Sequence, residues 1–307
     1  MTVDVSAALA AASSAALVVP AVDLATLAVT GADRRTWLNG LVTCDLAPRK
    51  EGEAVYGLFT AQKGRVLSDA IFLLDGERIL LAVPRAVVGE LRASLDHYLI
   101  MEDAEATEGA FEVELVHGPR ASDVLAAMQK AGARGAPLDV TGLGGAVVFV
   151  DPAARAAVDA ARDVALAAAG GVLGSEASWE ALRIARRVPR FGVDFDAATY
   201  PQEAGLEKRA ISFDKGCYLG QEVVCMLELR GHVKRKLVGL RLGGANVPAR
   251  GADVTDAGGE SVGAVTSAAV VPGEGVLALA MVKRTKGEPG AALRVGGTDA
   301  VVVAPAA

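Results

Sequence analysis

Hydrophobic and polar residues alternate along this chain in two periodic patterns, and each pattern predicts a type of secondary structure. Short runs rich in valine, isoleucine and leucine predict strands at 24–29, 55–59, 64–74, 79–83, 111–116 and 145–150. Alanine-rich stretches with a helical period predict helices at 34–41, 84–98, 121–131, 153–169 and 179–187. Because helices and strands interleave, we expect a mixed α and β fold over most of the chain.

The pattern changes near residue 236. Beyond it, short strands are predicted at 237–242, 261–268, 276–282 and 300–303, separated by glycine-rich turns and without a helical period. Such a pattern is typical of a small β-barrel or sandwich. We therefore divide the chain into residues 1–236 and a C-terminal β domain at 237–307, which gives an α+β protein.

One local pattern occurs twice. The residues around Gly31 and those around Gly118 each read as a strand, a glycine turn and a helix. A glycine permits the tight turn, and the helix N-terminus that follows offers free N–H groups to an anion. A packing turn in a duplicated unit is the commoner explanation of such a pattern.

Composition narrows the class of protein. The 307 residues are 52% hydrophobic, with 37 acidic against 31 basic side chains and a net charge of −6. This sign is wrong for a protein that wraps duplex nucleic acid, so an RNA contact would need a local basic patch. No run of about 20 apolar residues is uninterrupted by charge, and the N-terminus lacks the basic start of a signal peptide, which predicts a cytoplasmic protein.

The chain has three cysteines, and one of them stands among polar residues. Their spacing predicts neither a disulfide framework nor a zinc site, and the histidines have no metal-like spacing either, so no metal is expected. Lys215 could favour the thiolate of Cys217 two residues away, which would make it a nucleophile or ligand. A lone cysteine is more often a small buried hydrophobe, and this is our interpretation of Cys44 and Cys225.

Two further features are candidates for ligand binding. Trp179 and Arg183 are four residues apart, on one face of a predicted helix, and would suit a flat heterocycle with an anionic tail, although a tryptophan there is more often in the core. Asp69 lies on a predicted strand among apolar residues. The cationic run from Arg230 to Lys236 is by default a solvated strand face, with an acidic ligand or RNA as the alternative.

The segment KGCYLGQE at 215–222 resembles the signature of the YgfZ family, bacterial relatives of the mitochondrial iron–sulfur assembly factor. The segments GAD at 31–33, WLNG at 37–40, KGRV at 63–66, PQEAGL at 201–206 and ISF at 211–213 resemble the wider family that includes the T-protein of glycine cleavage. The resemblance runs in order through nearly the whole chain.

This resemblance implies a clover-like fold. Two interleaved αβ modules, the second at roughly 52–110, would surround a central channel that holds tetrahydrofolate, beside the C-terminal barrel. It also implies a role in the assembly or repair of iron–sulfur clusters, supporting client enzymes such as radical tRNA thiolases. Cys217 would be the functional thiol and Lys215 its electrostatic partner. The residues expected to contact folate are Trp179, Arg183, Asp69, Glu203, Tyr218, Gln221 and Glu222.

The chain departs from T-proteins in two motifs. Their paired aspartates correspond to Ser68 and Asp69, and their Arg-Leu-Glu-Ala-Gly motif, whose glutamate holds the pterin, corresponds to residues 183–187 with Ala185 in place of the glutamate. This departure disfavours aminomethyl transfer and predicts two arginines beside the pterin. We therefore expect a folate-binding accessory protein, with a folate-dependent aminomethyl or methyl transferase and an RNA- or protein-docking module as alternatives. A monomer is the default expectation.

Overall fold

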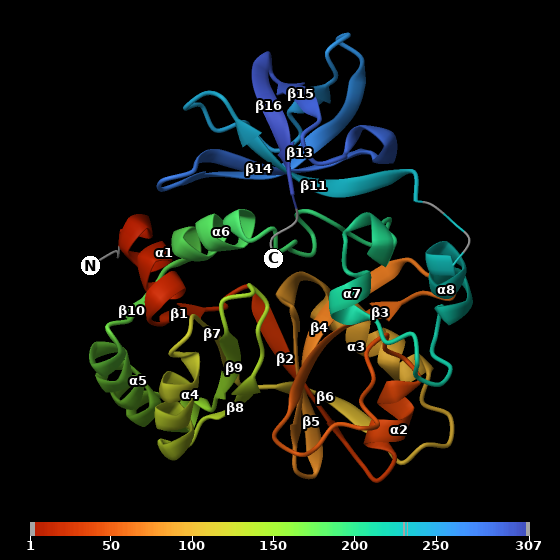
Figure 1. The fold of residues 1–307 in the computed structure, drawn as a ribbon. Coiled ribbons are helices and arrows are strands. Elements are labelled where there is room, and N and C mark those ends of the chain that lie inside the picture. Colours follow the sequence, from red (N-terminus) through yellow and green to blue (C-terminus); the bar gives the residue numbers. More distant parts are fainter. Residues whose placement is uncertain (1–3, 230, 232, 305–307) are drawn as a thin grey trace.

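The computed structural model describes residues 4–229, 231 and 233–304, and it arranges them as two sheet-and-helix modules below a barrel (Figure 1). The helices are α1 (Val5–Ser14), α2 (Arg34–Asn39), α3 (Val88–His97), α4 (Ala121–Lys130), α5 (Arg155–Ala169), α6 (Glu176–Ala185), α7 (Glu207–Ala210) and α8 (Gln221–Leu229). Short 3-10 turns lie at Arg85–Val87, Pro152–Ala154, Pro201–Glu203 and Arg284–Lys286.

The first module is a sheet with strand order β10-β1-β7-β9-β8. Its strands are β1 (Leu17–Pro20), β7 (Glu112–His117), β8 (Arg134–Pro137), β9 (Gly145–Val150) and β10 (Val172–Leu173). Helices α4 and α5 cover one face, and their apolar sides bury Val124, Met128 and Val158 against it. This burial of one apolar stripe explains why the alanine-rich sequences form helices here.

The second module is a sheet with strand order β3-β4-β5-β2-β6. Its strands are β2 (Leu24–Thr30), β3 (Ala54–Thr60), β4 (Val66–Asp75), β5 (Arg78–Pro84) and β6 (Glu105–Gly109). Helices α2 and α3 pack on its outer face, where Leu38 of α2 and Leu91 of α3 share a buried cluster with Phe72 of β4. The modules interleave because β1 leaves the N-terminus for the first sheet, β2–β6 form the second, and β7–β10 return to the first (Figure 1).

The inner faces of the two sheets pack on each other. Leu73 and Leu80 of the second sheet share a buried cluster with Leu115, Val147 and Phe149 of the first. Both sheets are thus covered on two sides, which explains the nearly continuous apolar runs of β4, β5 and β9.

The repeated glycine turn is a packing device. Gly31 and Gly118 have φ values of 100° and 114°, and each leads from a strand into a helix. A Cβ on Gly31 would lie 2.1 Å from the carbonyl oxygen of Asp103, and one on Gly118 would lie 2.6 Å from that of Ala15. Each glycine therefore lets the backbone entering a neighbouring strand pass close by.

The C-terminal region is a closed barrel in the order β11-β14-β13-β12-β15-β16. Its strands are β11 (Arg235–Leu242), β12 (Asp253–Thr255), β13 (Ser261–Val271), β14 (Gly275–Lys283), β15 (Ala292–Val295) and β16 (Thr298–Val303). Closure pairs β11 with both β14 and β16, so neither edge of that strand is left open. The mixed α and β fold with a C-terminal barrel confirms the predicted fold class.

Helix α6 lies between the barrel and the modules, and a buried ion pair holds it there (Figure 1). The Arg183 guanidinium donates to Asp194 at 2.7 Å and to the Ser267 hydroxyl of β13 at 2.8 Å, and both charged side chains are fully buried. Glu180 also accepts from Arg183, at 2.6 Å.

No described helix is both long and apolar enough to cross a membrane.

Removing one partner of the buried pair should cost much more unfolding free energy than removing one partner of an exposed pair. Arg183→Met should lower the free energy of unfolding by roughly 3–5 kcal/mol, because it leaves the buried Asp194 carboxylate without its cation. Arg294→Met is the matched control, since Arg294 pairs with Asp299 in solvent and should cost less than about 1 kcal/mol. Urea unfolding of both variants measures the difference, and equal losses would contradict the role of the pair.

Candidate functional site

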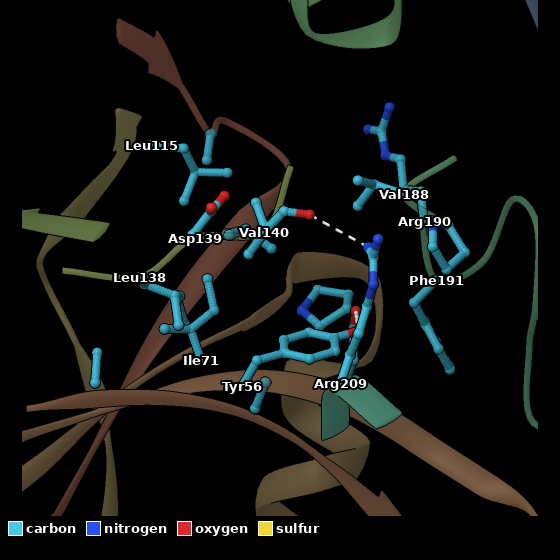
Figure 2. Close-up of a pocket in the computed structure, with 18 of the residues that line it drawn as sticks. Tyr56, Ile71, Leu115, Leu138, Asp139, Val140, Val188, Arg190, Phe191 and Arg209 are labelled. Carbon is cyan, nitrogen blue, oxygen red and sulfur yellow. Dashed lines mark hydrogen bonds between the residues drawn. The ribbon is translucent and has the colours of Figure 1, made fainter. Parts of the chain in front are cut away.

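A cavity of about 480 Å³ lies between the two sheets, beneath α6. Ile71, Leu115 and Leu138 form one side, and Arg190, Phe191 and Arg209 stand opposite (Figure 2). The wall is mostly apolar with a few polar groups, and its volume is in the range of small-molecule sites. The cavity corresponds in place to the central channel that the resemblance implies.

Asp69 and Tyr56 form a hydrogen-bonded pair on the cavity wall. Tyr56 lies opposite Ile71 in the β3–β4 hairpin, so Asp69 is its diagonal neighbour on the same face. The Tyr56 hydroxyl donates to Asp69 Oδ2 at 2.8 Å. Burial raises the pKa of Asp69 to about 6, although the Tyr56 hydrogen bond opposes the shift. The carboxyl can therefore act as either donor or acceptor near neutral pH.

Trp179 forms another part of the wall, and His117 supports it from behind. Their rings are stacked at 5.0 Å with an angle of 4° between their planes. Burial lowers the pKa of His117 to about 4, so the imidazole is neutral, and neither of its nitrogens has a hydrogen-bond partner within the described chain. The neutral imidazole holds the indole of Trp179 at the cavity wall, where it can stack on a flat ligand.

The cavity is bordered by cations from distant parts of the chain. The Arg209 side chain from α7 reaches across to donate to the Val140 carbonyl at 3.2 Å (Figure 2). Arg190 forms ion pairs with Asp23 at 3.0 Å and Glu180 at 2.9 Å, and Arg49 donates to the Asp45 carbonyl at 3.3 Å. Within the described chain Arg209, like Arg49, forms no ion pair, and it is placed to meet an anionic group.

The geometry corrects the expectation for Arg183. Trp179 and Arg183 were expected to face a ligand together, but only Trp179 lines the cavity. Every nitrogen of the Arg183 guanidinium donates to a protein group, and the side chain is fully buried toward the barrel. Its role is to hold α6 in position.

Lys215 also differs from the expectation. Its ammonium group is turned inward and donates to the carbonyl oxygens of Asn39, Val42 and Cys44 at 2.6–2.8 Å, and to Asn39 Oδ1 at 3.0 Å. An ammonium with its protons so engaged anchors the loop that carries Cys217. Lys215 is therefore a positioning residue, and its predicted electrostatic role toward Cys217 is not supported by these contacts.

Cys217 itself is exposed, between the buried side chains of Lys215 and Tyr218. It does not line the central cavity. Cys44 is buried, and burial raises the pKa of its thiol to about 12. Cys225 is half-buried on α8, and burial raises the pKa of its thiol as well. Of the three, Cys217 is the thiol open to reagents and partners.

The remaining expected folate contacts lie outside the cavity. Glu203 caps the backbone N–H of Tyr200 and pairs with Arg235 at 2.9 Å. Tyr218 packs beneath Lys215, with the ammonium 5.4 Å from its ring centre. Gln221 accepts a bond from the Tyr218 N–H at 3.3 Å, and Glu222 is exposed on α8. These residues shape the cysteine loop and its surroundings, which corrects their assignment to the cavity.

The cationic run is divided between ion pairs and solvent. Arg235 pairs with Glu203, and Lys236 pairs with Glu288 at 2.9 Å. Lys234 is exposed, whereas Arg230 and His232 lie outside the described residues. The predicted RNA contact along this run stays a prediction.

The T-protein motif at 183–187 is placed differently from expectation. Ala185 packs toward Leu277 and Leu279 of the barrel, so the cavity wall does not include it. Arg186 donates to the Thr141 carbonyl, and Arg187 lines a second cavity at the barrel. None of the arginines in this motif lines the central cavity, which corrects the expectation of two arginines beside the pterin.

Sequence reasoning missed Tyr56, Arg190 and Arg209. The alternation of β3 and β4 could have paired Tyr56 with Asp69 once their hairpin was recognised. The two arginines carry no local signal, because turns after α6 and at α7 bring them to the cavity. No group of three or more metal-binding side chains occurs in the described chain.

Comparison with known proteins gives this site a context. A family model described as the GCVT N-terminal domain matches residues 3–137. An aminomethyltransferase from Saccharopolyspora erythraea is 32% identical over 271 residues, covering 80% of this chain and 72% of that protein. The chain belongs to the YgfZ/GcvT-like family.

Other relatives of this YgfZ/GcvT-like protein include both a YgfZ protein and a glycine cleavage T-protein. The tRNA-modifying protein YgfZ of Yersinia enterocolitica is 29% identical, covering 76% of this chain and 73% of that protein. The crystal structure of glycine cleavage system aminomethyltransferase T from Bartonella henselae superposes with a TM-score of 0.82 at 20% identity, over 98% of this chain and 88% of that one. That similarity confirms the GcvT-like fold.

The raised pKa of Asp69 predicts a pH-dependent stability difference. The folded state binds the Asp69 proton more tightly than an unfolded chain with the ordinary pKa of 3.8. Its stabilising effect is present below pH 4 and is lost as pH rises through about 6. Relative to Asp69→Asn, the native protein should lose up to about 3 kcal/mol of unfolding free energy between pH 4 and pH 7. Urea unfolding at several pH values measures this difference, and a constant difference would contradict the burial of a raised-pKa carboxyl.

Proposed function

We propose that this chain is a tetrahydrofolate-binding accessory protein that supports iron–sulfur enzymes such as tRNA-modifying radical thiolases. The cavity with Trp179 and Asp69 on its wall is the observation that carries the folate part of the proposal. The exposed Cys217 on an anchored loop supports the second part. The naming of relatives as tRNA-modifying YgfZ proteins fits the same class of role.

The residues of the cavity fit tetrahydrofolate in chemistry and size. Trp179 and Phe191 offer ring faces for a bicyclic pterin, and Asp69 offers a carboxyl that can share or accept a proton at its N–H edge. Arg209 supplies a positive charge for the carboxylates of the folate tail. When bound, the folate would supply one-carbon chemistry or act as a signal of folate status.

Cys217 would work outside the folate cavity. Its exposure lets it meet a sulfur species, iron or a damaged cluster carried by a client protein. A thiolate there could act as nucleophile, transient ligand or redox switch. The hydrogen bonds of the Lys215 ammonium group would hold the loop in place during that contact, because they tie the loop to the Asn39–Cys44 segment.

Tetrahydrofolate should quench the fluorescence of Trp179. We expect saturable quenching in the native protein and its loss in Trp179→Phe, because Trp179 lines the cavity. Trp37 is the internal control, since it is buried in the second module and donates to the Tyr98 carbonyl. Equal quenching in both proteins, or none up to millimolar ligand, would overturn the folate site.

Cys217→Ser should abolish function in cells that depend on this protein for a cluster-dependent tRNA thiolase. Cys225→Ser is the matched control, because that thiol is half-buried and should be dispensable. Thiolated tRNA measures the outcome. Full complementation by Cys217→Ser would contradict the accessory role.

Aminomethyl transfer is the second candidate. That reaction would use the cavity with Asp69 and Tyr56 and would not need the surface thiol. The naming of the Saccharopolyspora erythraea relative as an aminomethyltransferase supports this candidate.

A further inference from the structure

A second cavity, of about 430 Å³, lies where the barrel meets the rest of the molecule. The turn after α6, the start of α7 and strands β11 and β16 form its walls. Its charged lining residues are Arg187, Glu207, Lys208, Arg209 and Lys236. It borders the central cavity, with which it shares Pro189 and Arg209, but neither Cys217 nor Trp179 lines it and the rest of its wall is separate.

Arg187 is in an unfavourable backbone conformation in this cavity. Its φ is +54°, and within the described chain it is the one non-glycine residue with a positive φ. A left-handed conformation costs such a residue about 1 kcal/mol or more. Arg187 occupies the position of the glycine in the T-protein motif, which would adopt this conformation without strain. The arginine therefore needs a compensating contact.

The protein makes room for this side chain but gives it no partner. A Cβ on Gly239 would lie 2.9 Å from Arg187 Nε and 3.1 Å from its Cδ. Gly239 is paired on both sides within the barrel, where a glycine weakens a strand and often marks a close approach. The half-buried guanidinium has no hydrogen bond or ion pair to any residue the structure describes.

The other charges leave the cavity cationic. Lys236 is already paired with Glu288, and Arg209 donates to a carbonyl, but Lys208 is exposed. Glu207 is the one acidic side chain among these five charged lining residues, and burial raises its pKa. Burial also lowers the pKa of Arg187, and Glu274 outside the cavity only partly opposes this shift. A partly desolvated guanidinium in a cavity that Lys208 also lines would gain most from an incoming anion.

We propose that this barrel-junction cavity binds a small anionic ligand, whose carboxylate or phosphate group pairs with Arg187 and Lys208. The guanidinium presents parallel N–H donors that match the oxygens of either group. Gly239 keeps that guanidinium against the barrel wall, where its donors remain unused by the protein. The site depends on the strained arginine, and a glycine at 187 would remove it.

Thermal unfolding in citrate or inorganic phosphate tests the site at fixed ionic strength set with sodium chloride. Either probe should raise the Tm of the native protein by at least about 2 °C at 10 mM, because ligand bound to the folded state stabilises it. Citrate as the stronger probe would indicate a carboxylate ligand, and phosphate a phosphate ligand. In Arg187→Gly the increment should fall by at least half.

The same variant has an opposite effect without the anion. Arg187→Gly should raise the Tm of the anion-free protein, since it removes both the strained backbone and the unpaired cation. Arg294→Gln is the matched control and should keep the full anion increment, because that exposed arginine pairs with Asp299 away from the cavity. Equal anion increments in the native and Arg187→Gly proteins would overturn the proposal.

Trp179→Phe separates this site from the folate cavity. It should leave the increment in Tm unchanged, even if it abolishes the response to tetrahydrofolate. Loss of the anion increment in Trp179→Phe would place the anion in the central cavity and overturn the second site.

Discussion

The buried ion pair between Arg183 and Asp194 fixes the position of α6 against the barrel. It joins α6 to the barrel through Ser267, and the same helix carries Trp179 into the wall of the central cavity. A buried pair is costly to desolvate, so its value lies in fixing one arrangement of parts rather than in net stability. The pair thereby holds the barrel, α6 and the cavity wall in fixed positions relative to one another.

The central cavity and the exposed thiol lie apart in this structure. Trp179 and Asp69 face the space between the sheets, whereas Cys217 is presented to solvent on a loop anchored by Lys215. A transferase needs its reacting groups at the ligand. An accessory protein needs a thiol that a client can reach. The separation of the two sites is therefore what distinguishes the proposed role from aminomethyl transfer.

The sequence predicted those elements whose signal is local. The period of β4, β5 and β9 and the alanine-rich stripe of α5 follow from burial on one or two faces, and strand β9 has the predicted bounds 145–150. The change of pattern near 236 lies within two residues of the start of β11 at Arg235. Helix α8 and the two-residue strand β10 were missed, because one follows a glycine-rich loop and the other is too short for a period.

The site was predicted only where a residue faces the cavity from a regular element. Trp179 and Asp69 are such residues, whereas Tyr56 was missed and becomes evident only from the pairing of β3 with β4. The partners of Arg183 and Lys215 lie up to 176 residues away, in contacts that no local pattern shows. A charged residue in a sequence thus has two uses, toward a ligand or toward buried acceptors, and only tertiary contacts decide between them.

Hydrogen–deuterium exchange with and without tetrahydrofolate would show where the ligand binds, without any substitution. If tetrahydrofolate binds in the central cavity, we expect new protection in peptides covering 54–58, 68–72, 138–142 and 188–191, and no change across 213–220. Protection confined to 213–220, with none at the cavity wall, would contradict the separation of the folate site from Cys217.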